Sequence, residues 1–214
     1  MSPTARESCW NPEAETMPLD ALRGLQARRL GETVQWAYDR VPFYRARLDE
    51  TGVRPDDIRS IDDLPRLPFT DKAALRDHYP FGLYAVPLRE VVRVHASSGT
   101  TGKPITTAYT EGDVENWSEC MARVLYAAGL RPGDIFQNAN GHGLFTGGFG
   151  FHHGATRIGC TVVPTSTGQT ERQIMLMRDF GVTGLSSTPS YALTMAERAE
   201  DMKVDLRALG LRVG

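Results

Sequence analysis

The chain has 214 residues, 41% of them hydrophobic, and is therefore long and apolar enough to bury a core of its own. Its 24 lysines and arginines nearly balance its 26 aspartates and glutamates. This balance excludes a large positive field that would attract nucleic acid or an anionic membrane over long range. The partners expected are small molecules and protein, with no nucleic acid and no membrane.

The first residues and the cysteines indicate where the protein resides. The N-terminus has acidic residues where a signal peptide would be basic and then apolar, and no stretch approaches the roughly 20 apolar residues of a membrane span. Three cysteines, far apart and without CxxC spacing, favour reduced thiols over a disulfide framework or a zinc site. These features predict a cytoplasmic protein, in which residues 1–18 form a loose N-terminal arm.

Residues 19–80 show a helical pattern that is interrupted repeatedly by proline. Helices are expected over 19–38 and 71–78, because apolar residues recur there at helical spacing. Between them, a residue before proline is pushed out of the helical conformation at Val41-Pro42, Arg54-Pro55, Leu64-Pro65 and Leu67-Pro68. This part of the chain is predicted to be a helical preface.

Residues 81–214 change to the spacing of strands near Val91–Val94 and then alternate between strand and helix. Helices are expected over 112–128, 169–179 and 189–201, and strands over 135–137, 160–163 and 182–186. Thr188 is the expected N-cap of the third helix, and Pro189 its first residue. The alternation predicts an α/β domain. Because residues 211–214 have the pattern of a further buried parallel strand, we expect this domain to be incomplete.

The segment around residue 100 is rich in hydroxyl groups and glycine and ends in a lysine. Glycines can turn backbone N–H groups toward an anion, hydroxyls add donors, and the lysine adds a positive charge. The segment predicts a polyphosphate-binding loop made of Ser97, Ser98, Gly99, Thr100, Thr101, Gly102 and Lys103. The alternative is a flexible surface turn.

A P-loop of the kinase or GTPase type is a sharper alternative, and the sequence argues against it. That motif needs a glycine where Ser97 stands and a serine or threonine where Pro104 stands. It also needs a helix after the loop. Here Pro104 begins an apparent strand that runs to Tyr109. The loop is therefore expected to join two strands.

The segment from Ser97 to Pro104 resembles the phosphate-binding signature of the adenylate-forming superfamily. Further stretches are similar, in order and spacing, to the bacterial phenylacetate-CoA ligases, and the resemblance covers the chain from about Leu19. These stretches are Phe43-Tyr44-Arg45, residues 64–70, Tyr109-Thr110, residues 143–148, residues 168–171 and residues 188–191. The chain is thus identified as resembling the N-terminal half of such a ligase.

The resemblance implies a two-step, AMP-forming reaction that serves aromatic acid catabolism. An aryl carboxylate, phenylacetate or a substituted relative, attacks the α-phosphate of ATP with Mg²⁺, and the thiolate of coenzyme A then displaces AMP. In the family the adenine and ribose motifs and the adenylation lysine lie beyond Gly214, so no catalytic residue is expected in this chain. The family often forms homodimers. The fold implied is a partial N-terminal domain of an adenylate-forming enzyme.

Residues 141–154 contain six glycines, and such density requires a reason, for example tight turns or a ligand close to the backbone. In the resemblance this segment lines the aryl-acid pocket, with Phe145 against the ring. The substrate-binding residues expected are Asn140, Gly141, Phe145 and Thr146. Asn140 stands where phenylacetate-activating members commonly have tyrosine, which favours a hydroxylated or otherwise substituted acid. Phe149 and Phe151 are expected to be core residues.

Three histidines in the same stretch invite a metal site, but none is predicted. His152 and His153 are adjacent and would point in different directions from a helix or a strand. Two alternatives to the ligase remain open. One is a non-catalytic nucleotide-binding or assembly module, and the other is an adenylating enzyme whose acyl acceptor is not CoA.

Overall fold

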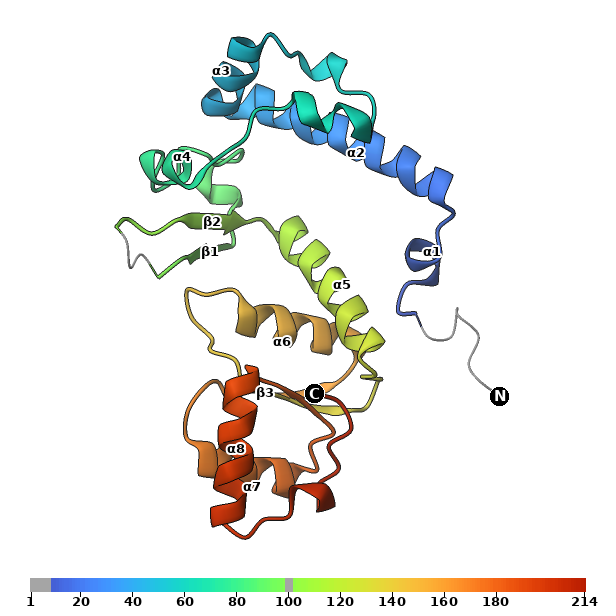
Figure 1. The fold of residues 1–214 in the computed structure, drawn as a ribbon, viewed down its shortest axis with the longest axis vertical. Helices are drawn as coiled ribbons and strands as arrows, with labels where there is room; N and C mark the ends of the chain where they lie inside the picture. The colour runs from blue at the N-terminus through green and yellow to red at the C-terminus, as the bar shows by residue number, and fades with distance from the viewer. Residues whose placement is uncertain (1–8, 99–101) are drawn as a thin grey trace. The chain divides into compact units, whose positions relative to one another are not determined.

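The computed structural model describes residues 9–98 and 102–214. The chain forms two compact units, Thr16–Glu111 on the one hand and Gly112–Gly214 with the N-terminal residues up to Glu15 on the other. Figure 1 shows the order of the elements along the chain. None of the helices formed by the described residues is long and apolar enough to cross a bilayer.

Unit Thr16–Glu111 begins with a helical pair. Helix α2 (Leu19–Arg40) ends where Val41 takes an extended conformation, and α3 (Pro42–Thr51) begins with proline in its first turn. Proline suits that position because its missing N–H would have no partner inside the helix. The pair buries Val34 and Leu48 in a core completed by Val53 and Ile58. The predicted helical preface is therefore present.

Short elements continue this unit. They are the 3₁₀ turns η1 (Pro55–Asp57) and η2 (Ile61–Arg66), helix α4 (Lys72–Asp77) and the 3₁₀ turn η3 (Leu88–Glu90). Helix α4 confirms the helix predicted over 71–78, and Asp71 is its N-cap, accepting a hydrogen bond from the N–H of Ala74 at 2.8 Å.

A β-hairpin closes the unit. Strand β1 (Arg93–Ala96) pairs antiparallel with β2 (Thr106–Tyr109), in a register that sets Arg93 opposite Tyr109 and Ala96 opposite Thr106. The first strand begins two residues later than the sequence pattern suggested. The second runs to Tyr109, as expected.

The second unit contains a parallel sheet. Its elements are α1 (Pro12–Glu15), α5 (Glu111–Ala127, from Gly112 on), β3 (Ile135–Asn138), α6 (Gly147–Ile158), β4 (Thr161–Val163), α7 (Thr170–Phe180), β5 (Gly184–Ser186), α8 (Pro189–Asp201) and η4 (Leu206–Ala208). The strands lie in the order β4-β3-β5. Val213 adds a parallel bridge to Gly184, so the strand expected near the end of the sequence does pair with the sheet.

Helices cover both faces of this sheet (Figure 1). On one face, α5 and α6 share a core with the sheet, built from Ala122, Leu125, Leu130, Phe136, Ala155 and Ile158. On the other, Met177 of α7 and Met195 of α8 pack with Val182 and the partly buried Ile135. Neighbouring residues of β3 thus face opposite layers, as alternation along a strand requires. The predicted α/β class is confirmed.

Helix α6 was not expected as a regular element, because glycine weakens helices. Its glycines have a packing role. A Cβ on Gly150 would lie 2.8 Å from Nε1 of Trp117, and one on Gly154 would lie 2.6 Å from Cβ of Met121. Trp117 and Met121 are one turn apart on α5, so the two glycines allow α5 and α6 to approach closely.

The N-terminal stretch also differs from expectation where it is described. Residues 9–15, taken from the sequence to be part of a loose arm, are anchored on α5. Nε1 of Trp10 and Nδ2 of Asn11 each donate to the carboxylate of Glu119 at 3.0 Å, and the Trp10 ring lies 5.8 Å from that of Tyr126. An indole with an apolar body and one N–H donor suits such a half-buried position.

Candidate functional site

The loop predicted to bind phosphate joins β1 to β2, and Ser97 forms its base. The N–H of Ser97 donates to the carbonyl of Ile105, and the N–H of Ile105 donates to Oγ of Ser97, both at 2.9 Å. The backbone N–H of Ser97 is thus engaged in closing the loop. Of the residues predicted to bind phosphate, Ser97 therefore stabilises the base of the loop. Its hydroxyl hydrogen is its remaining donor for a phosphate oxygen.

The other described residues of the loop are exposed. Ser98, Gly102 and Lys103 all face solvent, and Gly102 has φ +131°, a conformation that glycine adopts most readily. Nζ of Lys103 lies 5.8 Å from the centroid of the Tyr79 ring. Gly99, Thr100 and Thr101 lie outside the described residues. A strand, not a helix, follows the loop, as the sequence predicted.

The topology of the parallel sheet in the unit Gly112–Gly214 indicates a second possible ligand-binding site. The chain goes from β3 to β4 on one side and then crosses to β5 on the other side of β3. Ligands of open parallel sheets bind outside the carboxyl ends of the strands where the strand order reverses. In this sheet that point lies between the ends of β3 and β5, which we call the β3/β5 switch point. It is formed by the residues that follow Asn138 and Ser186.

Polar side chains meet at the β3/β5 switch point. Nδ2 of Asn140 donates to Oγ of Ser186 and, at 3.3 Å, to Oδ1 of Asn138. The fully buried Asn138 in turn donates from Nδ2 to the carbonyl of Gly148 at 2.7 Å. The structure therefore brings the predicted Asn140 to the switch point and ties it to the first turn of α6.

The other predicted acid-binding residues continue from Asn140 into α6. Gly141 is half-buried, and Phe145 is 73% exposed, with its ring over Gly147. The carbonyl of Thr146 accepts from the N–H of Gly150 at 3.3 Å, so Thr146 belongs to the start of the helix. Of the two phenylalanines expected in the core, Phe151 packs against the α5–α6 core.

A cluster of imidazole rings lies beside this segment. The ring centroid of His142 is 5.4 Å from that of Phe149 and 6.3 Å from that of His152. Burial, followed by the neighbouring His152, lowers the pKa of His142. No group of three metal-ligating side chains occurs among residues 9–98 and 102–214.

A buried polar network lies on the α7–α8 side of the sheet, and sequence reasoning missed it. Nε2 of Gln137 donates to Oε1 of Gln173 at 3.1 Å, and both residues are almost fully buried. Nε2 of Gln173 lies 3.0 Å from the hydroxyl of Tyr191. Two features of the sequence could have pointed to this network. Gln173 lies just after the stretch 168–171, and Tyr191 is the last residue of the stretch 188–191; both stretches contribute to the family resemblance.

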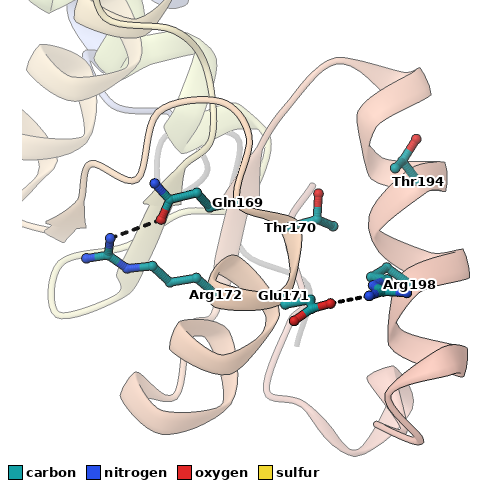
Figure 2. Close-up of a pocket in the computed structure, with 6 residues that line it drawn as sticks. All are labelled: Gln169, Thr170, Glu171, Arg172, Thr194 and Arg198. Carbon is teal, nitrogen blue, oxygen red and sulfur yellow. Dashed lines mark hydrogen bonds and ion pairs between the residues drawn. The ribbon is translucent and has the colours of Figure 1, made fainter.

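Two cavities open beside the first turn of α7. One has a volume of about 470 Å³ and is lined by Gln169, Thr170, Glu171, Arg172, Thr194 and Arg198. Figure 2 shows these six side chains. Across this cavity, the Arg198 guanidinium pairs with Glu171, and Arg172 donates to Oε1 of Gln169 at 3.1 Å (Figure 2). The other, of about 460 Å³, is lined by Val163, Pro164, Thr165, Thr167, Gly168, Gln169, Arg172, Gln173, Leu176 and Phe180.

The fold is similar to part of a solved acyl-CoA ligase. A solved structure of 2-hydroxyisobutyryl-CoA ligase, in complex with 2-HIB-AMP and CoA in the thioesterification state, superposes with a TM-score of 0.91 at 32% identity. The superposition covers 99% of this chain and 46% of the ligase. A structure of the same ligase in an open conformation gives a TM-score of 0.89 at 31% identity. The fold is therefore that of part of an adenylate-forming CoA ligase.

Curated sequences narrow the similarity to one kind of ligase. The chain is 56% identical over 202 residues to the phenylacetate-coenzyme A ligase of Thermus thermophilus. It is 51% identical over 200 residues to that of Pseudomonas putida and 50% identical over 201 residues to that of Escherichia coli. Each of these three matches covers 94% of the chain. The chain is therefore similar in sequence to part of the phenylacetate-CoA ligases.

The extent of the match is as informative as its strength. The chain spans about half the length of its curated relatives, with 45% of the Thermus ligase and 46% of the Escherichia coli ligase covered. No protein-family model matches the chain.

Proposed function

We propose that the complete polypeptide containing this chain is an AMP-forming ligase that converts an aryl carboxylic acid to its CoA thioester, with ATP as the second substrate. The carrying observation is the loop between β1 and β2, whose base is closed by Ser97 and whose exposed part presents Ser98, Gly102 and Lys103. The sequence similarity to phenylacetate-CoA ligases supports the same function.

In the first step, a carboxylate oxygen of the acid bonds to the α-phosphorus of ATP, and pyrophosphate leaves. The carboxylate is already ionised at pH 7, so this step needs no general base. The activation barrier is lowered chiefly by neutralising the charge of the phosphates. The ammonium group of Lys103 could supply that positive charge from the loop. Ser98 and the glycine backbone would add donors, together with the proposed ligands Gly99, Thr100 and Thr101.

Mg²⁺ would neutralise part of the charge on the phosphates. No ligand to this ion is assigned among the described residues.

In the second step, the thiolate of CoA bonds to the acyl carbon, and AMP leaves. We assign no catalytic residue for this step to the present chain. By family resemblance, the adenine and ribose motifs, the adenylation lysine and the completion of the domain that begins near residue 81 belong to other parts of the polypeptide. The 214-residue chain alone is thus expected to form no thioester, and a homodimer is expected for the complete ligase.

The acid is proposed to bind at the β3/β5 switch point, near Asn140, Gly141, Phe145 and Thr146. Asn140 supports a substituted aryl acid, because its Nδ2 is engaged with Asn138 and Ser186 while its Oδ1 could accept from a ring hydroxyl. The exposed ring of Phe145 would cover an aromatic substrate, a contact worth about 0.5–1.5 kcal/mol beyond burial.

ATP–pyrophosphate exchange with the complete polypeptide tests this function. Exchange should depend on an added acid and be fastest with aryl acids among a panel of aryl and alkyl carboxylates. Lys103→Ala should weaken exchange at limiting ATP by roughly ten- to a hundredfold, as expected for one charged contact. Lys72→Ala removes an exposed lysine from α4 and serves as the control. No exchange with any acid, or equal rates in the two variants, would contradict the proposal.

A further inference from the structure

Residues 166–169, called loop 166–169 below, follow the turn after β4 and have an unusual backbone. Ser166, Gly168 and Gln169 have φ of +60°, +83° and +49°. For serine and glutamine this left-handed conformation carries a cost, which must be offset by surrounding interactions. Contacts with other parts of the protein must therefore stabilise this backbone conformation.

Two side chains provide that restraint through hydrogen bonds to the loop backbone. Nε2 of Gln173 donates to the carbonyls of Ser166 and Gly168, both at 2.9 Å. The hydroxyl of Tyr191 donates to the carbonyl of Gly168, also at 2.9 Å. Gln173 is itself fixed, because its Oε1 accepts from Gln137 inside the protein.

Side-chain packing contributes little on one side of the loop. Thr167, Gly168 and Gln169 line the cavity of about 460 Å³ beside α7. At the C-terminal end of the loop, Gln169 accepts a hydrogen bond from Arg172. The ion pair of Glu171 with Arg198 joins α7 to α8 (Figure 2). Polar contacts thus define the conformation of the loop where packing does not.

The other side of the loop meets the predicted acid-binding segment. Oγ of Ser166 accepts from the N–H of His142 at 3.5 Å, and the N–H of Ser166 donates to the carbonyl of Asn138 at 3.2 Å. A Cβ on Gly141 would lie 3.9 Å from Cγ2 of Thr167. The loop therefore borders the residues that follow β3.

We propose that loop 166–169 is a second wall of the acid-binding site, and that Gln173 and Tyr191 are positioning residues that fix it against Gly141 and His142. The proposal rests on the function proposed above and deepens it. The loop sets how closely an aryl acid fits at the β3/β5 switch point. Loosening it raises the KM for the acid and leaves ATP binding unchanged.

A matched pair of glycine variants separates this role from stability alone. Gly168 and Gly133 have φ of +83° and +87°, and a Cβ on either would meet no atom within 4 Å. Alanine therefore introduces the same backbone strain at both positions and no clash. Gly133 lies in the turn between α5 and β3, where its N–H donates to the carbonyl of Gly159.

The experiment measures pyrophosphate exchange and thermal unfolding of the complete polypeptide. Both variants should lower the melting temperature by similar amounts, but only Gly168→Ala should raise the KM for the acid, roughly two- to tenfold, with the KM for ATP unchanged. Equal KM values for the acid in the two variants, with exchange intact, would overturn the role of the loop and leave the proposed function standing. Absence of exchange in the unsubstituted protein would overturn both.

Tyr191→Phe is the second variant, because it removes only a hydroxyl. It should also raise the KM for the acid roughly two- to tenfold. Tyr38→Phe is its control, since the Tyr38 hydroxyl also has a hydrogen-bonded partner, donating to Asp49 at 2.9 Å in the other unit. An unchanged KM in Tyr191→Phe would count against the positioning role.

Discussion

Individual buried polar residues organise the β3/β5 switch point. Gln137 and Asn138 are both fully buried on β3, and each has its side-chain amide nitrogen directed to a defined acceptor, whereas Oε1 of Gln137 has no hydrogen-bond partner among the described residues. Leaving a buried amide nitrogen without an acceptor would cost about 1–3 kcal/mol. Their pairing with Gln173 and Gly148 therefore fixes the geometry around Asn140.

Asn140 carries the first prediction at this scale. Tyrosine at this position would fill space and remove the amide that contacts Ser186. Asn140→Tyr in the complete polypeptide should shift kcat/KM toward unsubstituted arylacetate over ring-hydroxylated acids by roughly tenfold. This magnitude is within the discrimination that small changes in a pocket produce. Pyrophosphate exchange with paired acids measures the ratio, and an unchanged ratio would remove Asn140 from acid recognition.

Helix α6 shows how one element can depend on small residues. Gly150 and Gly154 face Trp117 and Met121 of α5 at distances that leave no room for a methyl group. The gain in helix propensity on replacing glycine by alanine, about 1 kcal/mol, is smaller than the cost of forcing two packed helices apart.

Gly154→Ala should therefore lower the free energy of unfolding by about 2 kcal/mol or more. The matched variant is Gly24→Ala, because Gly24 lies within α2 and a Cβ there would meet no atom within 4 Å. It should raise stability by about 0.5–1 kcal/mol. Urea unfolding followed by circular dichroism measures both, and effects of the same sign would contradict the packing argument.

The same elements show what sequence could predict. The strands β3 and β5 and helices α5, α7 and α8 were predicted to within about two residues, because their apolar spacing and end signals are local. Thr188, for example, is the N-cap of α8 and accepts from the N–H of Tyr191. Helix α6 was missed, since its glycines are explained only by contacts with α5.

In the candidate site, too, local features were predictable and tertiary contacts were not. The strand that follows the predicted phosphate loop was predictable from the sequence, and Asn140 was singled out there only as a candidate ligand of the acid. The use of the Ser97 N–H to close that loop was not predictable, because its partner Ile105 is defined only once the strands pair. The same holds for Gln173 and Tyr191, which meet loop 166–169 only after α7 and α8 have packed.

At the scale of the whole molecule, residues far apart in the sequence meet at one carboxylate. Glu119 on α5 accepts from Trp10 and Asn11 of the N-terminal stretch and pairs with Arg123 and with Arg157 of α6. Burial raises the pKa of Glu119, but the hydrogen bonds from Asn11, Trp10 and the two arginines outweigh it and lower the pKa to about 2.

This cluster predicts a pH dependence of stability. A depressed carboxyl pKa means that the unfolded chain binds the proton more readily, so the stabilisation is present above the ordinary pKa of 4.5 and is lost as the pH falls toward 2. Glu119→Gln should flatten the stability profile between these pH values and loosen residues 9–15. Glu13→Gln, which changes an acid of α1 instead, should leave the slope of stability against pH unchanged.

Urea unfolding between pH 2 and 6 measures both effects. Comparison with Trp10→Phe identifies the fluorescence of the Trp10 indole, which reports on residues 9–15. A slope in Glu119→Gln equal to that of the unsubstituted protein would show that this carboxylate does not join the N-terminal stretch to α5 in solution.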